Sequence, residues 1–398
     1  MEKNKEKKLF GLSPNIFFLG LVSLFNETSS AMVYSVMPAF LTVVLGAPPI
    51  LVSFIEGFAD ALASFLKIYF GWLSDRLRKR KKLAVIGYAI STSTRWFLAL
   101  VGNFWQVFIL RSIDRVGKGL RDSPRDALIS ESLDGDGIGH SFGYHRAMDT
   151  IGAVIGPLLA VLLLPLIVND YRFLFKIGFV IGILSIITFI FVRDKKINEP
   201  TDKSFTEHFS LSLGSYSYSF KIYILSIFIF GLGFMPLALI LLKSQDIGLS
   251  IYNIPLMYFI YNLSFVFFAV PAGNLSDRIG EYNVLVYGFL AAIIAYIVFI
   301  FSIDIFGIII AFILLGLYSA MTDGIERALA SKLVPQSRLA AGQGFLNAAV
   351  GMSSLLAAII GGFLWTYFSP TLALLYGLVM MGLGTIAFIH FNRHEVGL

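Results

Sequence analysis

The chain has 398 residues, of which 57% are hydrophobic and only 14% charged, and its formal net charge is +6. A soluble chain carries about a quarter charged residues, and a water-soluble fold of this length could not bury so much apolar surface. The composition therefore excludes an ordinary soluble enzyme or binding module and predicts a protein that lies in a lipid bilayer. Because the basic residues stand mostly between apolar runs, they indicate membrane topology rather than nucleic-acid binding.

The sequence contains no cysteine, which excludes disulfides, thiolate metal sites and cysteine nucleophiles. Its five histidines are scattered, and no glycine-rich nucleotide loop appears. We therefore expect no cofactor, no metal site and no enzymatic activity. The basic start of the chain precedes an apolar run of about 30 residues without a small-residue cleavage site, so we expect this run to be retained as a helix.

Twelve apolar runs have the length of about 20 residues that a helix needs to cross the hydrocarbon core. They cover residues 16–45, 50–72, 83–101, 105–128, 142–168, 173–192, 222–242, 251–272, 284–301, 305–329, 342–365 and 372–391. These runs predict an all-α membrane protein with twelve transmembrane helices. We divide it into a six-helix bundle at 1–192, a polar cytoplasmic linker at 193–220 and a second six-helix bundle at 221–398.

Lysine and arginine gather on one side of the predicted membrane, in the N-terminal segment, the loop at 76–82 and the linker. The positive-inside rule predicts that this side, with both termini, faces the cytoplasm. We expect a multi-pass protein of the cytoplasmic membrane, working as a monomer in the lipid bilayer. Its expected partners are a small-molecule substrate and protons, with no nucleic acid.

The segment GWLSDR at 71–76 recurs as GNLSDR at 273–278, which indicates two related halves. At these residues the chain resembles the major facilitator superfamily, whose loop between helices 2 and 3 carries the pattern Gly-x-Leu-Ala-Asp-Arg-x-Gly-Arg-Lys. The residues that match are Gly71, Leu73, Asp75, Arg76, Lys79 and Arg80, and Gly280 supplies the second glycine in the C-terminal copy. The resemblance implies two pseudo-symmetric six-helix bundles that transport by alternating access.

The resemblance also implies a conformational latch that holds the outward-open state. Its residues here are Gly71, Asp75, Arg76, Asp277 and Arg278. A contact that exists in one state only shifts the equilibrium between two states by its own free energy. The alternative interpretation is that these charges serve topology alone.

Ionisable residues inside a span cost about 3 kcal/mol each on insertion scales, so each is a functional candidate. Glu27, beside Asn26, falls near the middle of the first predicted helix, and Glu56 and Asp60 share one face of the second. The fourth helix carries a stripe of charges at three- and four-residue intervals, which we expect to face the protein interior. This stripe contains Arg111, Arg115, Lys118, Asp122 and Arg125.

Two interpretations of these charges remain open. In the functional one, Glu27, Asp60 or Glu56 binds protons, in that order of preference, while basic and polar groups bind an anionic substrate. The candidates for substrate binding are Arg95, Arg111, Arg115, Asn26, Tyr261 and Asn262. In the structural one, acids and bases form fixed ion pairs between helices, and the charges Arg121, Arg125 and Asp126 reach the cytoplasm.

The fifth predicted helix contains Gly143, Gly152, Gly156 and Pro157. This spacing resembles the antiporter pattern of proton-coupled drug exporters, and it favours export. Ordinary glycine-rich helix packing is the alternative, because small residues allow close helix approach.

The resulting hypothesis is a secondary transporter that exports a small organic solute, with an anion as one option, in exchange for protons. The main alternative is a proton symporter that imports an organic anion such as a carboxylate-rich metal chelate or a metabolite. A membrane-embedded enzyme would need a catalytic cluster that the sequence lacks. A receptor or scaffold without transport also fits the sequence.

Overall fold

The computed structural model describes residues 12–77, 80–132, 138–193, 216–245, 248–250, 253–335 and 338–395. The first half contains α1 (Pro14–Ala39) with a π-helical turn η1 (Phe40–Val44), α2 (Pro49–Leu77), α3 (Arg80–Leu98), α4 (Phe104–Glu131), α5 (Ile138–Leu166) and α6 (Tyr171–Thr188) with η2 (Phe189–Phe191). The second half contains α7 (Tyr218–Gly233), α8 (Leu237–Leu242), η4 (Lys243–Gln245), α9 (Ile254–Ile279), α10 (Glu281–Phe301), α11 (Ile305–Thr322), α12 (Ile325–Lys332), α13 (Leu339–Tyr367) and α14 (Pro370–Glu395).

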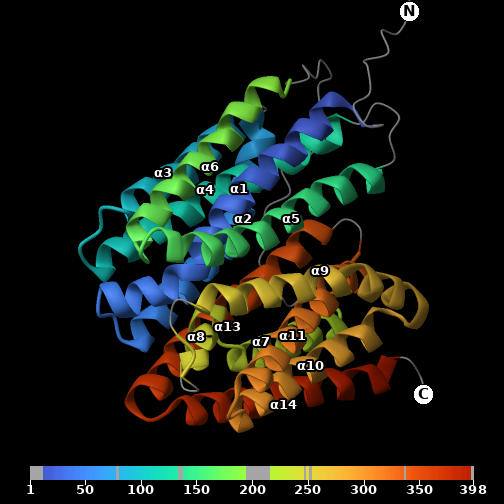
Figure 1. Ribbon diagram of the computed structural model, residues 1–398. Helices are drawn as coiled ribbons and strands as arrows, with labels where there is room; N and C mark the ends of the chain where they lie inside the picture. The colour runs from blue at the N-terminus through green and yellow to red at the C-terminus, as the bar shows by residue number, and fades with distance from the viewer. Residues whose placement is uncertain are drawn as a thin grey trace, which may run out of the picture.

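The helices form two bundles that lie side by side, α1 to α6 in one and α7 to α14 in the other (Figure 1). The start of α1 and the end of α14 lie at the same end of the molecule, which we name the terminal face. We name the other end the opposite face. Each of the twelve predicted spans overlaps one helix or, at 222–242 and 305–329, two consecutive helices, so the predicted fold is confirmed. The predicted bundle boundaries stay a prediction, because 194–215 lie outside the described residues.

Among the described residues, ten helical stretches are long and apolar enough to cross a membrane. The two remaining spans are α3 and α4, whose composition is too polar. α4 carries the charged stripe, and α3 carries a run of hydroxyl residues that ends in Arg95. These two helices pack against one another inside the first bundle, so their polar side chains find protein partners instead of lipid.

Two spans of the second half are interrupted, which the apolar pattern did not predict. Between α7 and α8 the chain leaves the helix at 234–236, where Pro236 has no backbone N–H to continue the hydrogen-bond ladder. The Met235 N–H that loses its helical partner donates to the hydroxyl of the fully buried Tyr296, at 2.9 Å. Between α11 and α12 the helix breaks at Asp323 and Gly324.

Side-chain caps fix the helix starts at the opposite face. The Asn103 carboxamide accepts from the Gln106 N–H at 3.1 Å, and Asp304 accepts from Gly307 at 2.9 Å. These bonds satisfy backbone donors that a helix start leaves free. At the terminal face, Gly280 joins α9 to α10 with φ of +87°, a conformation that favours glycine.

The two halves meet along two seams, α2 against α13 and α5 against α9. In the first seam the Ser53 hydroxyl donates to the Ala358 carbonyl at 2.8 Å. Close approach there requires Gly57, because a Cβ at this position would lie 2.2 Å from the Cβ of Ala358. In the second seam the guanidinium of Arg146 lies 5.7 Å from the ring centroid of Phe265.

Candidate functional site

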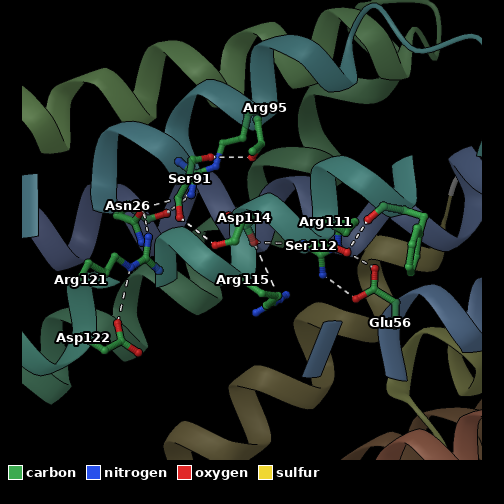
Figure 2. A network of polar contacts seen from close by, with 12 residues as sticks. Asn26, Glu56, Ser91, Arg95, Arg111, Ser112, Asp114, Arg115, Arg121 and Asp122 are labelled. Carbon is green, nitrogen blue, oxygen red and sulfur yellow. Dashed lines mark hydrogen bonds and ion pairs between the residues drawn. The ribbon is translucent and has the colours of Figure 1, made fainter. Parts of the chain in front are cut away.

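A buried ion pair joins α2 to α4 in the first half. Arg111 Nε donates to Glu56 Oε1 at 2.9 Å, and Arg111 Nη1 lies 3.5 Å from Asp114 Oδ2. The Glu56 side chain has no exposed surface, and Arg111 is also buried (Figure 2). Because the pair is desolvated and doubly bonded, it holds the two helices together whatever else it does.

A second buried group gathers around Asn26 of α1. Its side-chain oxygen accepts from Arg95 Nη2 at 3.0 Å and from Arg121 Nη1 at 2.9 Å, as Figure 2 shows. Arg95 packs toward α6, since a Cβ on Gly182 would lie 2.5 Å from Arg95 Nη1. Asn26 and Arg95 were both predicted to bind substrate. In the structure their side chains bond to one another inside the first bundle.

The sequence-based expectation that Arg121 reaches the cytoplasm is wrong. Its exposed fraction is 4%, and its guanidinium lies 4.8 Å from the ring centroid of Tyr88 as well as on Asn26. Helical spacing placed Arg121 near the polar end of α4, but it could not show that α1 and α3 enclose it there. Arg125 and Asp126, by contrast, pair with one another at 2.9 Å toward the terminal face.

Glu27 and Asp60 differ from Glu56, because neither carboxylate has a hydrogen bond or an ion pair among the described residues. Glu27 lies near the middle of α1 and has Asp149, Lys118 and Arg121 as its main electrostatic neighbours. Asp60 lies one helical turn beyond Glu56 on α2, and only its backbone carbonyl is bonded, to the Ser64 hydroxyl. A carboxylate without a partner in a low-dielectric site favours binding a proton or a cation.

Arg115 is a basic group of the stripe that has a spare donor. Its Nε lies 3.9 Å from Asp114 Oδ2, beyond hydrogen-bond distance, and makes no hydrogen bond in the described structure. In Figure 2 its guanidinium points away from the Arg111 and Asn26 groups. Arg115 and Glu27 are both electrostatic neighbours of Tyr258 on α9, so they face the second half.

Tyrosines of the second half stand opposite these charges. The ring of Tyr258 lies 5.1 Å from the ring of Tyr34 on α1, which in turn lies 5.4 Å from the Arg111 guanidinium. Tyr261 forms a 2.8 Å hydrogen bond with Ser319 of α11, and Asn262 donates to the Tyr258 carbonyl at 2.8 Å. Tyr261 and Asn262 thus have partners within their own bundle, whereas Tyr258 makes the aromatic contact between the halves.

The predicted glycine pattern of α5 coincides in part with close packing. A Cβ on Gly152 would lie 2.7 Å from the Leu24 carbonyl, and one on Gly156 would lie 2.5 Å from the Thr28 carbonyl. Both glycines therefore let α5 approach the backbone of α1 beside Glu27. Gly143 has no atom within 4 Å of its Cβ position, and Pro157 lies inside the helix.

The predicted latch is described in its second copy only. The side chains of Gly71, Asp75 and Arg76 lie outside the described residues, although α2 runs through these positions. Asp277 and Arg278 end α9 with exposed side chains, and the described structure gives them no hydrogen bond or ion pair. The latch therefore stays a prediction.

Two features of the second half were not assigned a role from the sequence. Arg146 of α5 forms an ion pair with Asp323, at the break between α11 and α12, and so links the two bundles. Glu326, three residues further, lines a small pocket with aromatic rings. A charged residue beside a helix break was the available signal, but the break itself is not visible in the apolar pattern.

The arrangement is a layer of charged groups on one bundle that faces tyrosines on the other. Glu27, Asp60 and Arg115 could exchange protons and bind charged groups, because none has a strong fixed partner. Glu56, Asn26, Arg95 and Arg121 fix the helices that carry them. A polar site near the middle of the membrane, between two pseudo-symmetric bundles, is where transporters of this architecture bind their substrates.

Comparisons with known proteins agree with this architecture. An uncharacterised MFS-type transporter of Methanocaldococcus jannaschii is 32% identical over 386 residues, which cover 96% of this chain and 95% of that protein. An uncharacterised protein of Mycobacterium bovis is 25% identical over 354 residues, covering 85% of each chain.

Solved structures share the fold at low sequence identity. The nucleoside transporter NupG, as a D323A mutant, superimposes with a TM-score of 0.80 at 16% identity, covering 96% of this chain and 99% of that one. A POT family transporter in complex with 5-aminolevulinic acid gives a TM-score of 0.80 at 13% identity, covering 98% of both chains. The family model of the Major Facilitator Superfamily matches residues 19–242 and 222–397. This chain is a multi-pass membrane transporter that belongs to the major facilitator superfamily.

Proposed function

We propose that this transporter exports a small organic solute in exchange for protons, and that it does not alter the solute chemically. The observation that carries the proposal is that two carboxylates of the first half, Glu27 and Asp60, have no hydrogen bond or ion pair among the described residues, on the bundle that also carries Arg115. Glu27 is our first candidate for the proton site and Asp60 the second. Glu56 ranks below them, because it is committed to Arg111.

Coupling follows from competition for the same space. Arg115 attracts an anionic group of the solute, and its charge also favours the ionised form of nearby carboxylates. When the solute neutralises Arg115, the carboxylates lose the charge that favours their ionised form and hold protons more strongly, so exchange requires that the change of state of the two bundles lowers this proton affinity again. A proton affinity that alternates with the conformation is what exchange requires.

The direction of transport rests on the α5 pattern, since Gly152 and Gly156 pack against the α1 segment that carries Glu27. We further propose that the terminal face is cytoplasmic and that the protein is a monomer of the cytoplasmic membrane. The latch at Gly71, Asp75 and Arg76, with Asp277 and Arg278, would then act on the cytoplasmic side. Symport of an organic anion with protons is the second candidate, supported by Arg115, whose Nε makes no hydrogen bond in the described structure.

The test begins with a counterflow screen on purified protein in liposomes, with citrate, benzoate, tetraphenylphosphonium and ethidium as radiolabelled probes. The internal pH is then followed while the transported probe moves down its gradient. Exchange moves protons opposite to the probe, and symport moves them with it. We expect Glu27→Gln to retain counterflow and to lose more than about nine tenths of the probe-dependent proton flux, a factor of ten being about 1.4 kcal/mol.

Asp126→Asn is the matched control, because Asp126 is a half-exposed carboxylate that pairs with Arg125 outside the proposed site. It should keep the wild-type proton flux. An undiminished probe-dependent proton flux in Glu27→Gln would remove Glu27 as the proton site. The same result in Asp60→Asn would remove the second candidate and leave only the lower-ranked Glu56.

A further inference from the structure

A pocket of about 80 Å³ lies inside the second half, apart from the charged layer of the first. Its lining includes Phe230, Phe234, Tyr318, Glu326, Ser353 and Ser354. An ordered water needs about 10–15 Å³ of such volume, so the pocket has room for a small organic group. It lies near the middle of the bundle, where the break after α7 and the break after α11 both end regular helix.

Glu326 is the charged residue of this lining, and its carboxylate has no partner. Within the described part of the chain it makes no hydrogen bond and no ion pair, and only its backbone carbonyl is bonded, by the Tyr223 hydroxyl at 2.8 Å. The neighbouring α13 contributes Val350, Ser353 and Ser354 to the lining, and none of the three carries a charge. An ionised carboxylate in such surroundings needs a counter-ion from outside the protein.

The nearby arginines are committed to another acid. Arg327 and Arg146 both pair with Asp323, the former at 3.5 Å and the latter across the seam between the bundles. Both arginines of this region therefore pair with Asp323 rather than with Glu326. Asp323 also places a second negative charge near Glu326. The remaining titratable groups that face Glu326 are Tyr318 of α11 and Tyr223 of α7. The pocket thus holds a carboxyl group without a fixed cation.

Aromatic rings form the opposite wall. Tyr318 lies 4.7 Å from Phe234 and 5.8 Å from Phe230, measured between ring centroids. Aromatic faces attract an ammonium group, and a carboxylate in reach adds direct charge pairing. A carboxylate, aromatic rings and two serines together suit a small protonated amine better than a hydrated metal ion, which prefers several oxygen ligands.

We propose that this pocket binds the protonated amine of a small organic solute, with Glu326 as its counter-ion and a proton on Glu326 when the amine is absent. The proposal rests on the proposed function in one respect only, since it makes an ammonium group part of the transported solute. It places a second exchange site in the C-terminal half. Binding of the amine displaces one proton from Glu326, so charge in the pocket is conserved.

The probe is propylammonium chloride, added to the purified full chain while infrared difference spectra record the C=O stretch of protonated carboxyl groups. We expect propylammonium to remove a protonated carboxyl signal, whereas 1-propanol, of matched size, and sodium chloride do not. Because proton and amine compete for one group, the apparent affinity should fall by about tenfold for each pH unit below the range in which Glu326 ionises. Tyr318→Leu should weaken binding by about three- to tenfold.

Glu326→Gln should lose the response, while Glu281→Gln keeps it, because Glu281 is a carboxylate of the same half that pairs with Lys332 at 2.6 Å. Both variants must elute as monodisperse protein. A response that persists in Glu326→Gln, or one that 1-propanol reproduces, overturns the proposal. A signal of protonated carboxyl groups that propylammonium leaves unchanged would also overturn the proposal. This measurement records binding and needs no transport. Its result is therefore independent of the outcome of the Glu27→Gln transport test.

Discussion

The two halves share one architecture but differ in what holds them together. In the first half, buried polar bonds link α1, α2, α3 and α4 through Asn26, Glu56 and three arginines, Arg95 of α3 and Arg111 and Arg121 of α4. In the second half, stacked rings fill the same depth, with Phe230 lying 4.2 Å from Phe289 and Tyr282 lying 4.8 Å from Phe388. The fold therefore tolerates two kinds of interior.

The difference shows how a pseudo-symmetric transporter can divide its tasks. Lipid is as apolar as the side chains of the second half, so that half gains stability mainly from close packing. The first half carries charges that are costly in lipid and must be paired, and the few that are not paired become available for chemistry. Glu27, Asp60 and Arg115 are available in this sense, and Glu326 is their counterpart in the apolar half.

The largest expected effect comes from breaking the buried pair of the first half. Glu56→Gln leaves the Arg111 guanidinium with only Asp114 at 3.5 Å, and uncompensated buried charge costs about 3–5 kcal/mol. We expect a fall in the thermal unfolding midpoint of the purified protein, measured by fluorescence in detergent. Arg111→Gln should destabilise to a similar degree.

The double variant sharpens this prediction. With Glu56→Gln and Arg111→Gln combined, two neutral amides remain, and the protein should be more stable than with either single change. Strictly additive losses would show that the two side chains do not stabilise one another. Buried polar pairs could then not be what holds the first half together.

Much of the fold was predictable because lipid imposes simple rules. Every run that the apolar pattern assigned as a span lies over helix, with a break in two of them, and this includes α3 and α4, whose charges lower their hydropathy. The apolar pattern did not predict the breaks at 234–236 and at Asp323: Pro236 marks the first in the sequence, but the bond from Met235 to the Tyr296 hydroxyl joins residues far apart in the chain. Periodicity carries no information on such tertiary bonds.

The site was predictable as a region but not residue by residue. The sequence located the charged stripe on α4 and the acids on α1 and α2, because charge inside a span is visible without coordinates. It could not tell that Glu56 is paired while Glu27 and Asp60 are not, nor that Arg121 bends onto Asn26. Which acid meets which base depends on helix rotation, and several pairings satisfy the same spacing.

A smaller effect is expected from the aromatic interior of the second half. Phe289 is fully buried and stacks on Phe230, so Phe289→Leu removes ring contacts and leaves a partly filled gap that costs about 1–2 kcal/mol. The unfolding midpoint should fall by less than in Glu56→Gln. A fall in the unfolding midpoint as large as that of Glu56→Gln would mean that the aromatic contacts stabilise the second half as much as the buried ion pair stabilises the first.

The smallest effect on stability, and the most informative on conformation, concerns the contact between the halves. Arg146 and Asp323 are each roughly half exposed, and an exposed pair contributes only about 0–1 kcal/mol. Arg146→Gln should therefore leave the unfolding midpoint nearly unchanged. The pair lies toward the terminal face, however, so opening the space between the bundles on that side must break it.

Even about 0.8 kcal/mol changes the ratio of two conformations by about fourfold, since 1.4 kcal/mol corresponds to a factor of ten. Because the chain has no cysteine, a single one introduced at Gly143 of α5, where a side chain meets no atom within 4 Å, is the only thiol to label. We expect Arg146→Gln to raise its labelling rate by a few-fold, with Arg172→Gln at the opposite face as the control. Equal rates in both variants would mean that the ion pair forms in every conformation, and that the charged and the aromatic half move without this contact as a restraint.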